Sequence, residues 1–266
     1  MSADRPQFYT GISSVEPFAN PGLPGGGPAA NDVTAAFYLI LRTTDLTPDV
    51  FICPQGIARY EAFDVQKFSN FPAPHRNSYS YANPYPSAAA VAGKWKFDTS
   101  LTPDDPFAAD MNYGDNPQGG PTKVSYTSNR LEMRTANSAN HWFDGQQVVY
   151  ADGHVEWQTT PFCGAVIKNR LFRDNIYANV AAVDPVTGRG GTVHGAPQNA
   201  GDAVLLPTAF DGPTGAVLTV ERLPSMTPPE TTNSPSQLLI VGLVVASILG
   251  VWAIVRLRKP SQANAA

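Results

Sequence analysis

The strongest hydrophobic pattern in the chain is an apolar run near its C-terminus. Residues 238–255, LLIVGLVVASILGVWAIV, contain no charged side chain. As a helix this run is about 27 Å long, close to the thickness of the hydrocarbon layer of a bilayer. We therefore predict one membrane-spanning helix within residues 237–257. Gly242, Ala246 and Gly250 recur in it at every fourth position, a spacing that permits self-association of two helices in lipid.

The segments on either side predict how this helix is oriented. Arg256, Arg258 and Lys259 follow it directly, and basic residues collect on the cytoplasmic side of a membrane. The short basic tail, residues 258–266, is thus expected in the cytoplasm and the rest of the chain outside it. Residues 224–236 are rich in Pro, Thr and Ser, which is typical of a semi-extended linker.

A second periodic pattern follows an irregular N-terminal segment, residues 1–30. Asn31 or Asp32 can accept hydrogen bonds from the free amides at the start of a helix. An apolar stripe then predicts a helix over residues 33–43, and its members are Ala35, Ala36, Leu39 and Ile40. The next apolar run, residues 50–53, ends at Pro54 and predicts a turn that enters a short strand.

The clearest strand pattern is QQVVYADGHVEWQ, residues 146–158. Two runs rich in Val, Tyr and Trp flank Asp152 and Gly153, a pair that favours a two-residue type I′ hairpin turn. Alternating side chains in both runs predict an antiparallel sheet with one buried face and one solvent-exposed face. Further strands are predicted in PFCG, RDNIYANV, DAVLLPTAFDG and AVLTVERL. Residues 31–223 are therefore expected to form one soluble α+β domain with long loops.

Composition and charge agree with one domain of this kind. The chain has 266 residues, of which 42% are hydrophobic and 15% charged, and its 22 Gly and 25 Pro favour turns and loops. The net charge is −4, and without the three basic residues after the apolar run it is about −7. Because nucleic-acid binders need a basic face, we expect no nucleic-acid partner.

Two cysteines, Cys53 and Cys163, leave two alternatives open. An exported domain can join distant segments by one disulfide. The other alternative is that both cysteines are unpaired and buried, since free cysteines are frequent core residues. Their wide separation in the sequence excludes a CxxC redox or zinc pair.

Seven fragments occur in an order that resembles the globular part of bacterial prepilin-like proteins. The resemblance is to the pseudopilin-G-like proteins of type II secretion that are abundant in planctomycetes and carry a motif from His to Asp-Gly. Here the motif runs from His141 across ten residues to Asp152 and Gly153, and the resemblance covers residues 31–212. The fragments are FICPQG, NSYSYANPYP, DDPFAADMNYG, NSANHWFDGQQVVYADGHVEW, PFCG, RDNIYA and DAVLLPTAFDG.

The resemblance implies a pilin-like fold, in which a helix packs on a small antiparallel sheet with variable loops. It also implies a structural, non-catalytic role in surface fibres or secretion machinery. Members normally begin with a basic leader, a processing site and an apolar helix, and none of these occurs before Phe8. We therefore expect a membrane-tethered envelope domain rather than a polymerising subunit. Its expected partners are the lipid bilayer and envelope or secretion-system proteins.

The best candidate site is a group of polar residues around the motif. His141, Asp144 and Asp152, with His154 and with Asp110 and Asp115 as further candidates, carry side chains that ligate transition metals or calcium. No spacing among them matches a calcium loop. We favour the alternative that these residues stabilise turns, as Asx side chains commonly do, and we predict no obligatory cofactor.

The sequence favours a protein that is not an enzyme. It has no GxSxG, HExxH or GxxxxGK[ST] motif, and the adjacent pair Asp104 and Asp105 is typical of a solvated loop. The alternative is a membrane-tethered carbohydrate-binding or carbohydrate-cleaving protein, and a third hypothesis is a calcium-dependent adhesive module. The aromatic residues that can stack on sugars are more often packing residues; they are Tyr79, Tyr81, Tyr85, Trp95, Trp142 and Trp157.

Overall fold

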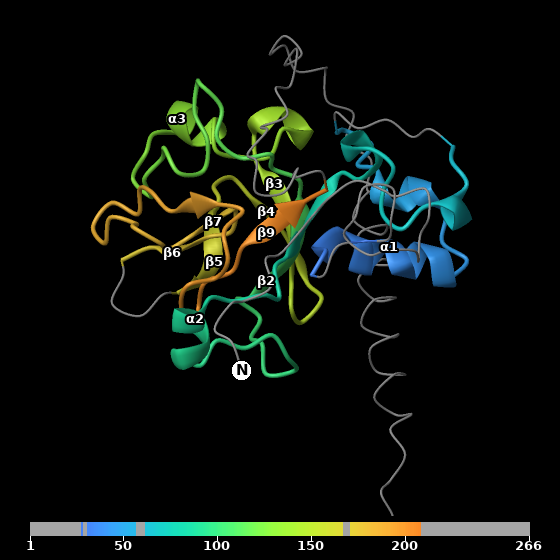
Figure 1. The fold of residues 1–266 in the computed structure, drawn as a ribbon. Helices are drawn as coiled ribbons and strands as arrows, with labels where there is room; N and C mark the ends of the chain where they lie inside the picture. The colour runs from blue at the N-terminus through green and yellow to red at the C-terminus, as the bar shows by residue number, and fades with distance from the viewer. Residues whose placement is uncertain (1–27, 29–30, 57–61, 167–170, 209–266) are drawn as a thin grey trace, which may run out of the picture.

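The computed structural model describes residues 28, 31–56, 62–166 and 171–208, which form an α+β structure with a small antiparallel sheet (Figure 1). The α-helices are α1 (Val33–Thr43), α2 (Ala88–Ala92) and α3 (Arg130–Arg134). The short 3₁₀ segments are η1 (Pro48–Phe51), η2 (Val65–Lys67), η3 (Pro74–Arg76) and η4 (Asn140–Phe143). The strands are β1 (Tyr79–Ala82), β2 (Pro106–Asp110), β3 (Gln146–Tyr150), β4 (Val155–Gln158), β5 (Phe162–Val166), β6 (Arg173–Asn175), β7 (Ala178–Asn179), β8 (Thr192–Val193) and β9 (Leu205–Pro207).

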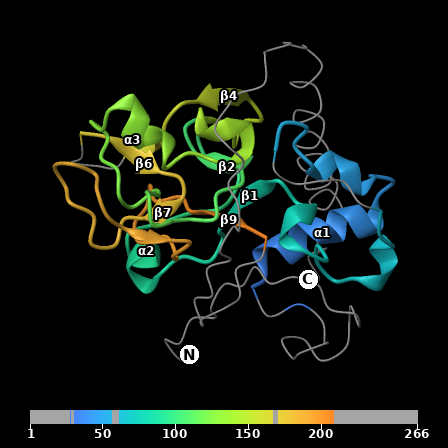
Figure 2. The ribbon, with the colours of Figure 1, turned by 90° about the horizontal axis from the view of Figure 1, so that it is seen from above.

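One five-stranded sheet forms the centre of the domain. Its order is β4-β3-β2-β1-β9, and every neighbouring pair is antiparallel. The strand β9 adds to β1 from far along the chain, pairing Leu206 with Tyr81. Two smaller pairs, β5 with β6 and β7 with β8, lie beside this sheet. Figures 1 and 2 both place α1 on one side of the sheet and α3 with β6 and β7 on the other.

The strands β3, β2, β1 and β9 are buried on both faces, and the hydrophobic residues along each of them alternate between two clusters. The edge strand β4 is partly exposed. Under α1, one cluster joins the helix and the segments after it to the strands; its sheet members are Tyr81, Ala108, Val149 and Leu206. The next residue along or back on each strand faces the opposite cluster, whose sheet members are Ala82, Ala109, Val148 and Leu205. That second cluster is closed by Ile176 and Tyr177. Of the two runs predicted to have one exposed face, β3 is buried on both faces, so the prediction is wrong for β3, whereas β4 is partly exposed.

Helix α1 has the predicted bounds, but its buried face is shifted from the predicted stripe, of which Ala35 is buried while Ala36 and Leu39 are exposed. The side chain of Asp32 accepts a hydrogen bond from the Ala35 amide at 3.1 Å, which makes Asp32 the N-cap. The buried face contains Tyr38 and Leu41, whereas Leu39 of the predicted stripe is 51% exposed. The aromatic side chains explain the difference in phase, because Tyr38 packs edge-on against Phe71 in the cluster under the helix.

The Asp-Gly hairpin forms at the predicted place, but with a different turn. The amide of Gly153 donates to the carbonyl of Tyr150, and the amide of Tyr150 donates to the carbonyl of His154. In this turn Gly153 has a positive φ of 91° and Asp152 does not. The connection is thus a three-residue loop in which a type I turn is followed by a left-handed glycine, rather than the type I′ turn that was predicted.

The segment after α1 also differs from the prediction. Instead of entering a strand at residues 50–53, the chain forms η1, which begins at Pro48 and buries Phe51. Pro48 has a fixed φ that suits the first turn of a helix, and Phe51 packs edge-on against Phe71 under α1. Burial of this aromatic side chain decides the local conformation, which a short apolar run alone does not specify.

The predicted linker, membrane-spanning helix and basic tail lie outside the described residues, and so do Gly242, Ala246 and Gly250. In the part of the chain that the structure describes, no helix combines the length and the apolar character needed to cross a bilayer.

The N-cap of α1 provides a test of the fold. Replacing Asp32 by Ala should lower the free energy of unfolding by about 1–2 kcal/mol, because the Ala35 amide loses its acceptor. Burial raises the pKa of Asp32 to about 7, against the hydrogen bonds that it accepts, so the ionised carboxylate opposes folding as pH rises toward this value. Urea unfolding is therefore best measured at pH 5, where the folded protein holds Asp32 neutral. The control is Asp45→Ala, an exposed position beyond the C-terminus of α1. Equal stability of the two variants would contradict the capping role.

Candidate functional site

The candidate site is built around the carboxylate of Asp110, the last residue of β2. Its side chain is only 1% exposed. The side-chain amide of Asn140 donates to Asp110 Oδ1 at 3.1 Å, and the backbone amide of Gln147 donates to Oδ2 at 2.7 Å. A buried carboxylate is costly unless its oxygens are hydrogen-bonded and its charge is balanced. These two donors satisfy the first requirement.

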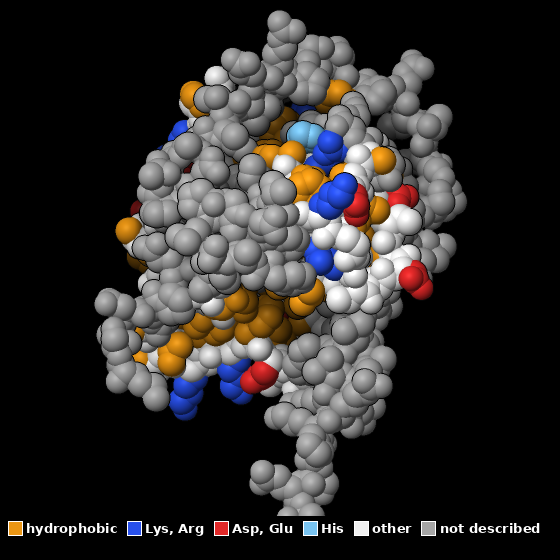
Figure 3. Space-filling model, turned by 45° about the vertical axis from the view of Figure 1, so that its right-hand side comes forward, with side chains coloured by type: hydrophobic (Ala, Val, Ile, Leu, Met, Phe, Trp, Pro, Cys, Tyr) orange, Lys and Arg blue, Asp and Glu red, His pale blue; other side chains and the backbone are white. Residues whose placement is uncertain are grey.

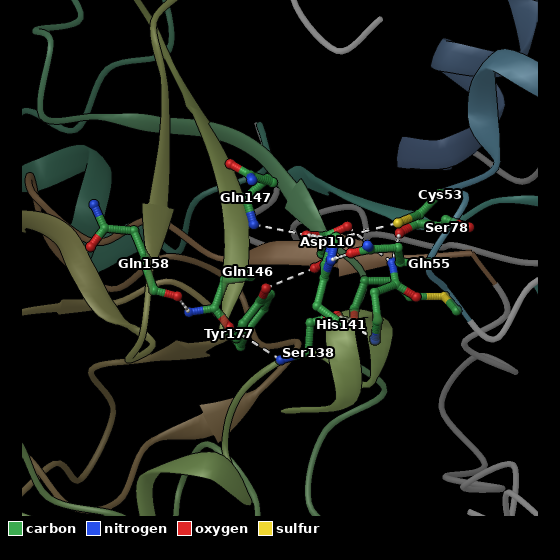
Figure 4. Close-up of polar contacts among 12 residues, drawn as sticks. Cys53, Gln55, Ser78, Asp110, Ser138, His141, Gln146, Gln147, Gln158 and Tyr177 are labelled. Atoms are coloured by element: carbon green, nitrogen blue, oxygen red, sulfur yellow. Dashed lines mark hydrogen bonds and ion pairs between the residues drawn. The ribbon is translucent and has the colours of Figure 1, made fainter. Parts of the chain in front are cut away.

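The motif histidine, His141, balances the charge. Its Nε2 lies 3.1 Å from Asp110 Oδ2 and 3.5 Å from the Sγ of Cys53. Its Nδ1 lies 2.8 Å from Oε1 of Gln55. Figure 4 shows these side chains converging from β2, from η4 and from the segment after η1. The imidazole therefore joins three parts of the chain that are far apart in sequence.

These contacts set the protonation of His141. Burial alone lowers the pKa of an imidazole, because it disfavours the charged form. Here the hydrogen bonds and charges of Asp110 and Cys53 outweigh burial and raise the pKa of His141 to about 10. The amide oxygen of Gln55 can only accept, so Nδ1 carries a proton. At neutral pH the ring is an imidazolium whose Nε2 proton is shared with the two partners on its other side.

The backbone at this histidine is in an uncommon conformation. His141, Trp142 and Phe143 have φ values of 54°, 59° and 63°, all in the left-handed region. Each such residue costs about 1–2 kcal/mol relative to the right-handed region. The turn is held by side-chain donors, because Arg134 Nη2 donates to the Trp142 carbonyl at 2.9 Å and Asn137 Nδ2 to the Phe143 carbonyl at 3.2 Å. Strain concentrated at one turn and held from several sides marks a position with a specific task.

A second buried amide extends this network away from the carboxylate. Gln146, at the start of β3, donates to the carbonyls of Gln158 and Thr160 and accepts from the amide of Ser138. The hydroxyl of Ser138 in turn donates to the Met111 carbonyl at 2.6 Å. This set of bonds fixes the segment before His141 against the sheet.

The structure separates the residues of the predicted metal site. Asp144 pairs with Nε of Arg134 at 3.2 Å, and Asp152 accepts from the backbone and ring of His154 in the hairpin. Those bonds lower the pKa of Asp152, the backbone amide of His154 contributing most. Among the described residues, Cys53, Asp110 and His141 alone form a group of three possible metal-ligand side chains. The set of His141, Asp144 and Asp152 is therefore wrong as a common ligand site, and His141 has other partners.

The two cysteines are free and buried, as in the second alternative, so the possible disulfide is not formed. Cys53 lies against His141, whereas Cys163 belongs to the cluster on the opposite side of the sheet. Burial raises the pKa of the Cys163 thiol to about 12. Cys163 is thus a core residue, and Cys53 is part of the site.

The residues that sequence reasoning missed at this site are Cys53 and Gln55. Both stand in FICPQG, the first of the fragments that resemble prepilin-like proteins, while His141 stands in the fourth. The residue types alone pointed to a possible site, since Cys, Asp and His side chains bind metals and act as acids and bases. Cys53 and Asp110 are 57 positions apart in the sequence, and Asp110 and His141 are 31 apart. No spacing rule joins residues so far apart, and they come into contact only when the sheet forms.

Comparisons of the chain with protein-family models, with curated proteins and with solved structures gave no match.

The pairing of His141 with Asp110 gives a direct prediction. Replacing His141 by Ala leaves a buried carboxylate without its cationic partner, which typically costs about 3–5 kcal/mol of stability. Urea unfolding at pH 7 should show this loss. A chelator keeps metal ions away from Cys53, Asp110 and His141 during the measurement. The matched control is His154→Ala, which removes an exposed imidazole from an exposed carboxylate and should change stability far less. Similar losses in both variants would show that burial of Asp110 does not depend on His141.

A second buried histidine gives a prediction of the opposite kind. His194 donates from Nε2 to the Asn112 carbonyl at 3.0 Å, and burial lowers its pKa to about 4. The folded protein then binds fewer protons than the unfolded chain between pH 6.5 and about 4, so stability is lost as pH falls through this range. The His194 contribution to this loss is about 3 kcal/mol.

Denaturant unfolding at pH 7.5 and pH 4.5 measures this effect. His194→Gln should reduce the difference in stability between the two pH values, because the amide does not titrate. His75→Gln, at an exposed histidine in η3, is the control and should keep the wild-type pH dependence. An unchanged pH dependence in the His194 variant would contradict the assignment.

Proposed function

We propose that this protein is a non-enzymatic envelope protein with a pseudopilin-like domain. In this proposal residues 238–255 tether the domain to a membrane, and the domain acts outside the cytoplasm as a structural or binding component of a cell-surface or secretion assembly. The ordered fragments that resemble prepilin-like proteins support the family, and α1 lying across β1 and β9 is the arrangement that such a domain requires.

The burial and the contacts of the motif histidine, His141, carry the proposal. A catalytic acid or base must reach a substrate, and its proton must be free to move. His141 is instead only 13% exposed, and its ring contacts join three segments that are far apart in sequence. The motif thus serves to fix the loop before the hairpin onto the sheet, which is a structural task.

The aromatic side chains weigh against the carbohydrate-binding alternative. Trp95 stacks on Phe97 and donates its indole N–H to the Asp202 carbonyl at 3.0 Å. Trp157 packs edge-on against His141. Each tryptophan thus has a ring partner within the chain, although Trp157 is 43% exposed. A sugar site needs an open ring face with polar groups around it.

The charge pattern bears on whether the partner is a nucleic acid. In the view of Figure 3, Lys and Arg side chains are scattered among acidic, polar and apolar ones, with no continuous basic area in the part that is described. A phosphate backbone is bound through clustered basic residues. The scattered charges in this view therefore give no support for a nucleic-acid partner.

The tether and its orientation are tested by fractionation and protease treatment of cells that express the full chain. An antibody against the domain should find the protein in the membrane fraction, and protease added to spheroplasts should digest the domain. Deleting residues 238–255 should release the protein, because the apolar run is the proposed tether. Deleting residues 224–236 instead is the control and should leave it in the membrane. A domain that survives the protease, or a chain lacking residues 238–255 that stays membrane-bound, would overturn the proposal.

Assembly is tested in the same cells by cross-linking before extraction. A structural component should migrate in complexes larger than the monomer, and these should disappear in the His141→Ala variant if the fixed loop is needed for assembly. A protein that stays monomeric at native expression levels would contradict the assembly role while leaving the tether intact.

A further inference from the structure

We propose that Cys53, Asp110 and His141 form a binding site for a divalent transition metal, with zinc as the best-fitting ion. The three ligand atoms are Cys53 Sγ, Asp110 Oδ2 and His141 Nε2, and all lie within 4.8 Å of one another. The ligands come from the segment after η1, from β2 and from η4. The proposal of a metal site does not depend on the proposed function in the cell envelope.

Two of the three separations between the ligand atoms match edges of a tetrahedron around zinc, and the third is at most 4.8 Å. Zinc–sulfur bonds of 2.3 Å and zinc–nitrogen bonds of about 2.05 Å at tetrahedral angles place the sulfur and nitrogen about 3.6 Å apart, and the nitrogen and a carboxylate oxygen about 3.3 Å apart. The observed separations are 3.5 Å from Cys53 to His141 and 3.1 Å from His141 to Asp110. A metal ion can therefore replace the shared proton with movements of a few tenths of an ångström.

The ligands are also oriented as metal ligands usually are. Metal-bound histidines commonly donate their other ring N–H to an oxygen, which fixes the tautomer and the ring plane. Nδ1 of His141 makes this bond to Gln55 Oε1, so Nε2 is the nitrogen left to face the ion. Asp110 is held in the same way, since Asn140 and the Gln147 amide fix its two oxygens.

Unsatisfied polar atoms border the same group. Asn140 Oδ1 and Ser78 Oγ are both buried and have no hydrogen-bond partner. A methyl group on Gly56 would lie 2.7 Å from Asn140 Oδ1 and 3.2 Å from Cys53 Cβ, so the orphan oxygen is next to the cysteine. Ser78 lies beside Cys53 in Figure 4. Buried polar atoms of this kind are expected where a fourth ligand, such as a metal-bound water, needs partners.

The donor set decides which ion fits. Thiolate and imidazole ligands select zinc and related transition metals, whereas calcium takes six to eight oxygen ligands and magnesium prefers carboxylates and water. One sulfur, one nitrogen and one oxygen therefore exclude calcium at this place. A metal site also explains the strained turn at His141, because the left-handed backbone directs Nε2 toward the other two ligands.

The full-length protein, purified in a mild detergent with a chelator and dialysed, tests the site with Zn²⁺ and Co²⁺ alone. Zinc should bind one ion per chain, and at a hundredfold excess over its dissociation constant it should raise Tm by about 5–10 °C. Cobalt should produce the near-ultraviolet absorption band of a thiolate–metal bond. Absence of both the band and the Tm shift in the wild type would overturn the proposal.

Matched variants locate the ion. Cys53→Ser should abolish the cobalt band, whereas Cys163→Ser, at the other buried cysteine, should keep it. Gln55→Ala changes an exposed residue that only positions His141, and it should weaken zinc binding about 10- to 100-fold without unfolding the protein. A band that survives in Cys53→Ser, or zinc affinity that is unchanged in Gln55→Ala, would place the ion elsewhere.

Discussion

The requirement to balance one buried carboxylate organises much of this domain. Asp110 ends the central strand β2, where water cannot solvate its charge, so its oxygens must be met by protein groups. The groups that meet it come from the start of β3 and from the turn before it, and His141 carries the bond onward to Cys53 and Gln55. Satisfying this single side chain therefore fixes how the N-terminal segments, the sheet and the loop before the hairpin are placed.

The same requirement explains why the chain accepts a strained turn. Three successive residues in the left-handed region are unfavourable by themselves, and a right-handed turn would direct His141 elsewhere. The ion pair inside the protein, together with the bonds from Arg134 and Asn137 to the turn carbonyls, offsets that cost. The structural role of the motif and its capacity to hold a metal thus have one origin, which is the fixed direction of Nε2.

Local signals were sufficient to predict the elements whose determinants are close in sequence. The cap at Asp32 and the periodicity after it predicted α1, and the Asp-Gly pair predicted the hairpin between β3 and β4. The buried face of α1 and the double burial of the sheet were not predictable, because Phe71 and Tyr177 come from distant parts of the chain. The site was half predicted: His141 and Asp110 were among the candidates, while their contact with each other and with Cys53 and Gln55 depends on the fold and on no local pattern.

The late arrival of β9 has a consequence for how the domain is made. The strand β1 pairs with β9 through Tyr81 and Leu206, and Asn77 donates to Thr208 across 131 positions. Until residue 207 has left the ribosome, β1 has one open side and Leu206 is absent from the cluster under α1. Contacts of such long range slow folding, because the loop must close before they form. The nascent chain therefore stays without its finished sheet until β9 has been made.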